Sequence, residues 1–221
     1  MHPFLSPLYK TFKHHADPAN AAAMQAYMKD HFPFFGIKTP ERRALLKDHI
    51  AAHGPPALQE LPFIARAAFQ LPEREVHHVA IDLVLKHAKK LGPDHLPLLE
   101  DLITTKSWWD SVDALAAHGV GTILKRYPKE IPMWNKRWIG SPNMWLNRTA
   151  ILFQIRWKKD TDQALLFANI DRHAGHSDFF IRKAIGWALR ELSATDPEAV
   201  KAFVASRRLS PLSVREALRK I

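Results

Sequence analysis

Apolar residues recur at intervals of three and four along most of the chain, which is the spacing of one face of an α-helix. The segments VAIDLVLKHA (79–88) and AILFQIRW (150–157) show this spacing clearly. No segment alternates apolar and polar residues as a half-buried β-strand does. The pattern predicts an all-α protein of about a dozen helices joined by short loops. No stretch has the composition of a linker, so we predict a single domain over residues 1–221.

Helix starts are marked by a capping residue followed by proline, because proline suits the first helical position, where no N–H is needed. This signal occurs five times, at Asp17-Pro18, Thr39-Pro40, Ser141-Pro142, Asp196-Pro197 and Ser210-Pro211. Further starts are predicted near Pro72, Pro93, Ser107, Pro128, Asp160 and Ser177.

A small residue recurs at a fixed interval in the long helices. Ala80, Ala114, Ala150 and Ala184 are separated by 34, 36 and 34 residues, and each is followed by Ile or Leu. This period is typical of two-helix HEAT-like units stacked into a curved solenoid. The small side chain would allow the paired helix to approach closely.

The same register predicts which side chains share a surface. Positions five before, one before and three after each alanine form one stripe along the second helix of each unit. The stripe carries Trp109, Asp113, Thr149, Lys183 and Trp187, with Arg148 and Arg182 beside it. Second helices of a solenoid stack side by side, usually along the concave face. We therefore expect aromatic groups, one acid and several basic groups on one wall.

The charge balance narrows the choice of partner. Lys+Arg number 32 against 22 Asp+Glu, a formal net charge of +10, which favours a polyanion, most often nucleic acid, although a basic surface can also serve solubility alone. The chain has no cysteine, which excludes disulfides, Cys-ligated zinc and a thiol nucleophile. That usage fits a reducing cytoplasm. No apolar run is long enough to span a membrane, and the N-terminal segment does not resemble a signal peptide.

Trp109 and Asp113 lie four residues apart and would share one helix face. One interpretation is a core helix with an acid at its surface; the other is a carboxylate placed beside an aromatic wall, where proton affinity is perturbed. Paired histidines such as those of RHAGH (172–176) could bind zinc, but no third ligand or glutamate base accompanies them, so we expect solvated histidines and no metal. No glycine-rich phosphate loop is present, and no cofactor is expected.

Five segments resemble the AlkD-type DNA alkylation repair glycosylases over the length of the chain. They are MKDHFPFFGIKTPERR (28–43), LPEREVHHVA (71–80), TKSWWDSVD (105–113), NMWLNRTAILFQ (143–154) and FFIRKAIGWALRE (179–191). The resemblance implies HEAT-like repeats with DNA in a concave cradle. It also implies release of cationic alkylated purines, N3-alkyladenine and N7-alkylguanine, by hydrolysis of the N-glycosidic bond. The expected partner is double-stranded DNA bearing such bases, bound by a monomer in the bacterial cytosol near the nucleoid.

The resemblance also implies roles for individual residues. Asp113 would be the essential carboxylate, and Trp109 and Trp187 the aromatic walls. Arg148 would be a basic residue of the catalytic set that contacts the DNA backbone. The other expected DNA contacts are Tyr27, Lys38, Phe179, Phe180, Arg182, Lys183 and Arg190. Lys38 departs from the family pattern, in which we expect glutamine, and would add a phosphate contact.

The chemistry of the lesion agrees with this residue set. Alkylation at N3 or N7 makes the purine a cationic leaving group, so no general acid is needed, and a carboxylate can stabilise the cationic sugar and activate water. Tryptophan faces attract cations. No buried lysine indicates Schiff-base chemistry, so we expect a monofunctional enzyme. Two alternatives are a non-catalytic HEAT-repeat nucleic-acid-binding protein and a protein-interaction scaffold; an acid on a phosphate-facing wall is unexpected in the first.

Overall fold

The computed structural model describes residues 1–221, which are helices and connecting segments without a β-strand. The all-α prediction is therefore confirmed. The chain forms two compact units, Met1–His87 and Ala88–Ile221. The single domain over residues 1–221 stays a prediction. None of the helices is sufficiently long and apolar to cross a membrane.

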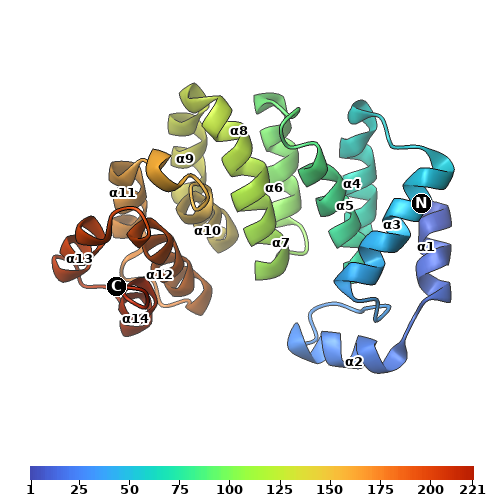
Figure 1. Ribbon diagram of the computed structural model, residues 1–221, viewed down its shortest axis with the longest axis horizontal. Coiled ribbons are helices and arrows are strands. Elements are labelled where there is room, and N and C mark those ends of the chain that lie inside the picture. The colour runs from blue at the N-terminus through green and yellow to red at the C-terminus, as the bar shows by residue number, and fades with distance from the viewer. The chain divides into compact units, whose positions relative to one another are not determined.

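The first unit contains five α-helices (Figure 1), and its core forms where α4 packs against α5, α5 against α3 and α3 against α1. Their bounds are α1 Leu5–His14, α2 Pro18–Tyr27, α3 Thr39–His53, α4 Leu61–Gln70 and α5 Arg74–Lys86, with a 3₁₀ turn η1 at Leu58–Glu60. A buried carboxylate organises the loop between α2 and α3: Glu75 of α5 accepts hydrogen bonds from the backbone N–H groups of residues 35–37 at 2.8–3.1 Å.

The second unit stacks helix pairs in chain order (Figure 1). Its α-helices are α6 Leu96–Thr104, α7 Trp109–Ala114, α8 Gly121–Arg126, α9 Ile131–Ile139, α10 Met144–Leu152, α11 Gln163–His173, α12 Phe179–Ser193, α13 Pro197–Ala205 and α14 Pro211–Ala217. Short 3₁₀ turns are η2 Pro93–His95, η4 Pro128–Glu130 and η5 Lys158–Asp160. The α7–α8 rod packs on α10, and α10 packs on α12, so the second helices of consecutive pairs are neighbours.

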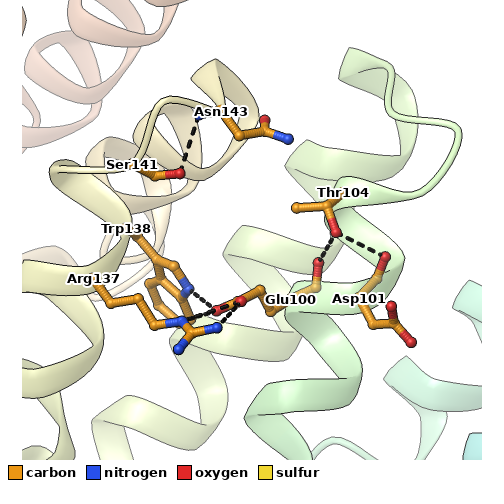
Figure 2. A network of polar contacts seen from close by, with 7 residues as sticks. All are labelled: Glu100, Asp101, Thr104, Arg137, Trp138, Ser141 and Asn143. Carbon is orange, nitrogen blue, oxygen red and sulfur yellow. Dashed lines mark hydrogen bonds and ion pairs between the residues drawn. The ribbon is translucent and has the colours of Figure 1, made fainter.

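Polar contacts join the first helices of consecutive pairs at separations close to the predicted period. Figure 2 shows Glu100 of α6 accepting hydrogen bonds from Arg137 and from the indole of Trp138 on α9, the latter at 2.8 Å. One pair further on, Asn135 and Asn169 exchange amide hydrogen bonds at 2.9 and 2.7 Å across 34 residues. Side chains separated by 34 to 38 residues thus join the first helices of consecutive pairs, which supports the HEAT-like repeat inferred from the alanines.

Three of the five predicted N-caps are confirmed by side-chain hydrogen bonds to the first turn, those of Asp17, Asp196 and Ser210. The prediction at Ser141 is wrong by two residues, because the Asn143 side chain accepts from the Trp145 N–H while Ser141 Oγ accepts from the Asn143 N–H. At the Thr39-Pro40 signal, Thr39 is already helical and makes no cap.

A π-helical segment, η3 (Leu115–Val120), interrupts the second helix between α7 and α8. A π turn holds more residues than an α turn, so side chains beyond Ala114 are rotated relative to the α-helical register. Ala114, the last residue before this segment, is half-buried, whereas Ala150 and Ala184 of the other second helices in this unit are fully buried. The repeat alignment therefore places the helices correctly but not every side chain on α7–α8.

Candidate active site

Asp113 and Arg148 form a bidentate ion pair in the second unit. Asp113 lies in the last turn of α7 and Arg148 in the middle of α10, 35 residues later, so the pair joins neighbouring repeats. Arg148 Nε donates to Asp113 Oδ1 and Nη2 donates to Oδ2, both at 2.7 Å. The Arg148 side chain is 5% exposed and that of Asp113 is 16% exposed. The carboxylate is therefore fixed in orientation while one side of it still reaches solvent.

A third repeat contributes to the same guanidinium. Arg148 Nη1 donates to the backbone carbonyl of Phe180, in the first turn of α12. Three of the five N–H groups of the arginine thus bond within the protein. With 5% of its side chain exposed, Arg148 offers little surface for the phosphate contact that the sequence predicts. The ion pair and this carbonyl bring α7, α10 and α12 together at one point.

The electrostatic environment of the carboxylate has opposing parts. Burial raises the pKa of Asp113, the hydrogen bonds and the charge of Arg148 oppose that rise, and the nearby carboxylate of Asp110 adds to it. The net direction is upward from the ordinary value of aspartate. A carboxylate with raised proton affinity, held rigidly at the edge of solvent, is suited to accept a proton from water or to stabilise a cation.

An aromatic cluster adjoins the ion pair. The ring of Phe180 lies 4.9 Å from Trp108 in an edge arrangement and 5.2 Å from Trp145. The guanidinium of Arg148 lies 6.0 Å from the Phe180 ring centroid. We did not single out Trp108 and Trp145 from the sequence as site residues. The available signal was the register, since Trp145 stands at the same repeat position as Trp109.

The predicted aromatic walls differ in their surroundings. Trp109, the first residue of α7, is half-buried and lies one turn before Asp113. Trp187 on α12 is also half-buried and packs against the hydrophobic core that runs from α10 to α14. Thr149 contradicts the predicted stripe: it is fully buried and its hydroxyl bonds to the Trp145 carbonyl at 2.8 Å, so it lines no surface.

Predicted DNA contacts gather on the first turns of α12. Phe179 is 50% exposed, and Arg182 is half-buried with a weak 3.4 Å bond to the Asp178 carbonyl. Lys183 is held by Glu216 of α14 at 3.1 Å. Arg190, two turns further along α12, is nearly buried and also bonds to Glu216, at 2.7 Å. Arg182, Lys183 and Phe179 are therefore available to a ligand, and Arg190 is the least accessible of the predicted contacts.

Tyr27 and Lys38 belong to the first unit and line one surface pocket with Met24 and Phe34. Tyr27 is 68% exposed, and Lys38 follows the loop that Glu75 holds. The structure thus brings together the two predicted contacts of this unit. No group of three His, Asp or Glu side chains is arranged to hold a metal ion in either unit.

Comparison with known proteins gives one family. The sequence profile described as "DNA alkylation repair enzyme" matches residues 8–221. A solved structure described as a predicted DNA alkylation repair enzyme from Enterococcus faecalis is 35% identical, covers 93% of this chain and 96% of its own, and has a TM-score of 0.87. AlkD2 from Streptococcus mutans is 19% identical over 80% of this chain and 88% of its own, with a TM-score of 0.61. At that identity the likeness to AlkD2 shows the fold alone. No curated protein sequence matches.

Proposed function

Because the chain belongs to the DNA alkylation repair enzyme family, we propose that it is a monofunctional DNA glycosylase that hydrolyses the N-glycosidic bond of N3-alkyladenine and N7-alkylguanine. One observation carries the proposal: a carboxylate of raised proton affinity, Asp113, is fixed by two 2.7 Å hydrogen bonds from Arg148 and still reaches solvent. In this geometry a fixed negative charge can stabilise the positive charge that develops on the sugar in the transition state.

The leaving group needs no protonation by the protein. Alkylation places a positive charge on the purine, which leaves as a neutral base when the C1′–N bond breaks. Positive charge then develops on the deoxyribose. Asp113 would stabilise that charge and accept the proton of the water that adds to C1′. A half-buried Trp109 one turn away adds a face that attracts cations, at about 0.5–2 kcal/mol.

Arg148 is assigned a positioning role in this mechanism. Its guanidinium orients both oxygens of Asp113 and is itself oriented by the Phe180 carbonyl. The pair has no net charge, which reduces the repulsion that a lone carboxylate would exert on DNA phosphates. Arg148 thereby makes an acid compatible with a nucleic-acid-binding surface.

DNA contacts are proposed from both units. In the second unit they come from Phe179, Arg182, Lys183 and, less accessibly, Arg190, with Trp187 as an aromatic wall. In the first unit they come from the pocket shared by Tyr27 and Lys38. The substrate is proposed to be double-stranded DNA with alkylated bases, bound by a monomer in the bacterial cytosol. The proposed chemistry requires no cofactor.

The test is base release from duplex DNA bearing N3-methyladenine or N7-methylguanine, with protein in excess so that one turnover is observed. We expect Asp113→Asn to lower the rate by ~10²-fold or more, the range for loss of one electrostatic stabiliser or base. DNA affinity should be kept or slightly raised, because a negative charge is removed. Thermal unfolding of the variant, measured alongside, shows that the protein is folded at the assay temperature.

Asp110→Asn is the matched control. Asp110 lies in the first turn of α7, and its charge raises the pKa of Asp113. Asp110→Asn should lower the rate of base release much less than Asp113→Asn does. Equal, full activity of both variants would refute the carboxylate mechanism. A wild-type protein that binds DNA tightly yet releases base no faster than the protein-free solution would indicate nucleic-acid binding without catalysis.

A further inference from the structure

A basic pocket lies in the second unit at the C-terminal ends of α8 and α10. Its charged lining comprises Lys89, His118, Lys125, Arg126 and Arg156, and no acidic side chain lines it. These residues come from four segments: the turn before η2, the π segment, α8 and the loop after α10. Segments separated along the sequence therefore converge on one positively charged opening.

Two residues of the lining, Trp157 and Gly121, are tightly packed. Trp157 is 8% exposed and its indole N–H donates to the Gly121 carbonyl at 3.0 Å. A Cβ atom on Gly121 would lie 2.1 Å from the Phe153 carbonyl oxygen, so α8 and the end of α10 approach as closely as backbones can. Flexible cationic side chains thus surround a fixed aromatic base. The adjoining π segment is the kind of helix irregularity often found at functional sites.

The positive charge in the pocket is poorly compensated within the protein. Lys89, His118 and Arg156 have no hydrogen bond or ion pair from their side chains, whereas Lys125 pairs with Asp160 at 2.8 Å and Arg126 donates to the Leu91 carbonyl at 2.9 Å. Partial burial and the charge of Arg156 lower the pKa of His118. Like charges that face one another in this way gain stability when an anion enters.

We propose that this pocket binds a phosphate group, separately from the Asp113 site. Arginine and lysine side chains donate several N–H groups to phosphate oxygens, and the Thr122 hydroxyl in the lining can add one more. The phosphate comes either from a DNA backbone or from free phosphate in solution. Neither Asp113 nor Arg148 lines this pocket, so it shares no lining residue with the ion pair.

The test uses the full chain with the double substitution Lys89→Gln/Arg156→Gln. Both side chains are exposed and unpaired, so their loss should not disturb the fold. The matched control, Lys129→Gln/Lys136→Gln, removes the same charge from exposed positions of the same unit outside the pocket. The first measurement is the affinity for undamaged duplex DNA over a range of salt concentrations. The second is the NMR titration of the His118 ring with and without sodium pyrophosphate.

If the pocket takes backbone phosphates, the slope of log K against log salt should become shallower by about 0.9 for each lost contact, up to about 1.8 in the pocket variant, and stay unchanged in the control. Pyrophosphate should raise the pKa of His118 in the wild type and not in the pocket variant. A pyrophosphate effect with an unchanged DNA slope assigns the site to free phosphate. The proposal is overturned if pyrophosphate leaves His118 unchanged and the two variants have equal slopes. Neither measurement requires base release, so failure of the proposed function would be seen separately.

Discussion

Replacing Arg148 by glutamine separates a positioning role from a phosphate contact. The substitution removes both 2.7 Å bonds to Asp113 and the bond to the Phe180 carbonyl, and leaves a carboxylate that is only 16% exposed without its cation. Removal of one partner of a buried ion pair lowers the free energy of unfolding by about 3–5 kcal/mol. Because Asp113 is partly exposed, we expect the lower end of this range, about 3 kcal/mol. In a chain of this length that corresponds to a fall in Tm of about 6–12 °C.

The pH dependence of base release separates the two roles of Arg148 more clearly than the Tm does. In the proposed mechanism base release requires ionised Asp113, so activity should fall as the pH drops through its pKa. Burial raises that pKa while Arg148 opposes the rise, so the acid limb of the wild-type profile should lie above the ordinary range of aspartate. In Arg148→Gln the opposing contribution is gone and the limb should move to still higher pH. The measurement is single-turnover base release against pH, after subtraction of the protein-free rate at each pH.

Arg182→Gln is the control for this experiment. Arg182 makes one weak 3.4 Å bond to a backbone carbonyl and no contact with Asp113, so its loss should weaken DNA binding and leave the acid limb in place. The positioning role is refuted if Arg148→Gln behaves in the same way, with reduced affinity, an unmoved acid limb and an unchanged Tm.

Two further predictions concern packing and the first unit. Gly186→Ala would place a Cβ atom 2.5 Å from Glu216 Cβ and 2.9 Å from the Ser213 carbonyl oxygen, so α12 and α14 must separate; we expect a loss of about 1–3 kcal/mol in denaturant unfolding, and an unchanged midpoint would contradict this packing. Glu75→Gln removes the charge that accepts three backbone N–H groups in a buried site, and should cost about 1–3 kcal/mol and speed proteolysis near Lys38; equal cleavage rates would show that the loop does not depend on the carboxylate.

Local signals were the most reliable part of the sequence prediction. A capping side chain bonds to N–H groups two or three residues away, so Asp17, Asp196 and Ser210 could be recognised without knowledge of the fold. The N-cap prediction at Ser141 was wrong because a second capping residue, Asn143, lies two positions later and forms the N-cap. The repeat period also predicted the stacking of second helices, since it depends only on spacing.

Side-chain contacts between repeats were harder to predict. Asp113 and Arg148 were both selected, but not as a pair, although their separation of 35 residues is one repeat and should have indicated contact. The π segment has no sequence signature that we recognised, and it shifts the register only of residues after Ala114. Thr149 on α10 shows a separate error, because shared position along a helix does not tell how deeply the neighbouring helix covers it.

The guanidinium shared by α7, α10 and α12 has a consequence for folding cooperativity. In repeat proteins each unit is stabilised mainly by its immediate neighbours, and terminal units fray first. Because Arg148 bonds to Asp113 on one side and to the Phe180 carbonyl on the other, its geometry is complete only while three successive second helices are docked. Local opening of α12 would therefore release the arginine and loosen the carboxylate without any change in α7 itself. If Asp113 acts as proposed, activity depends on the docking of the C-terminal repeats, and hydrogen exchange in α12 should set an upper limit on how long the site stays assembled.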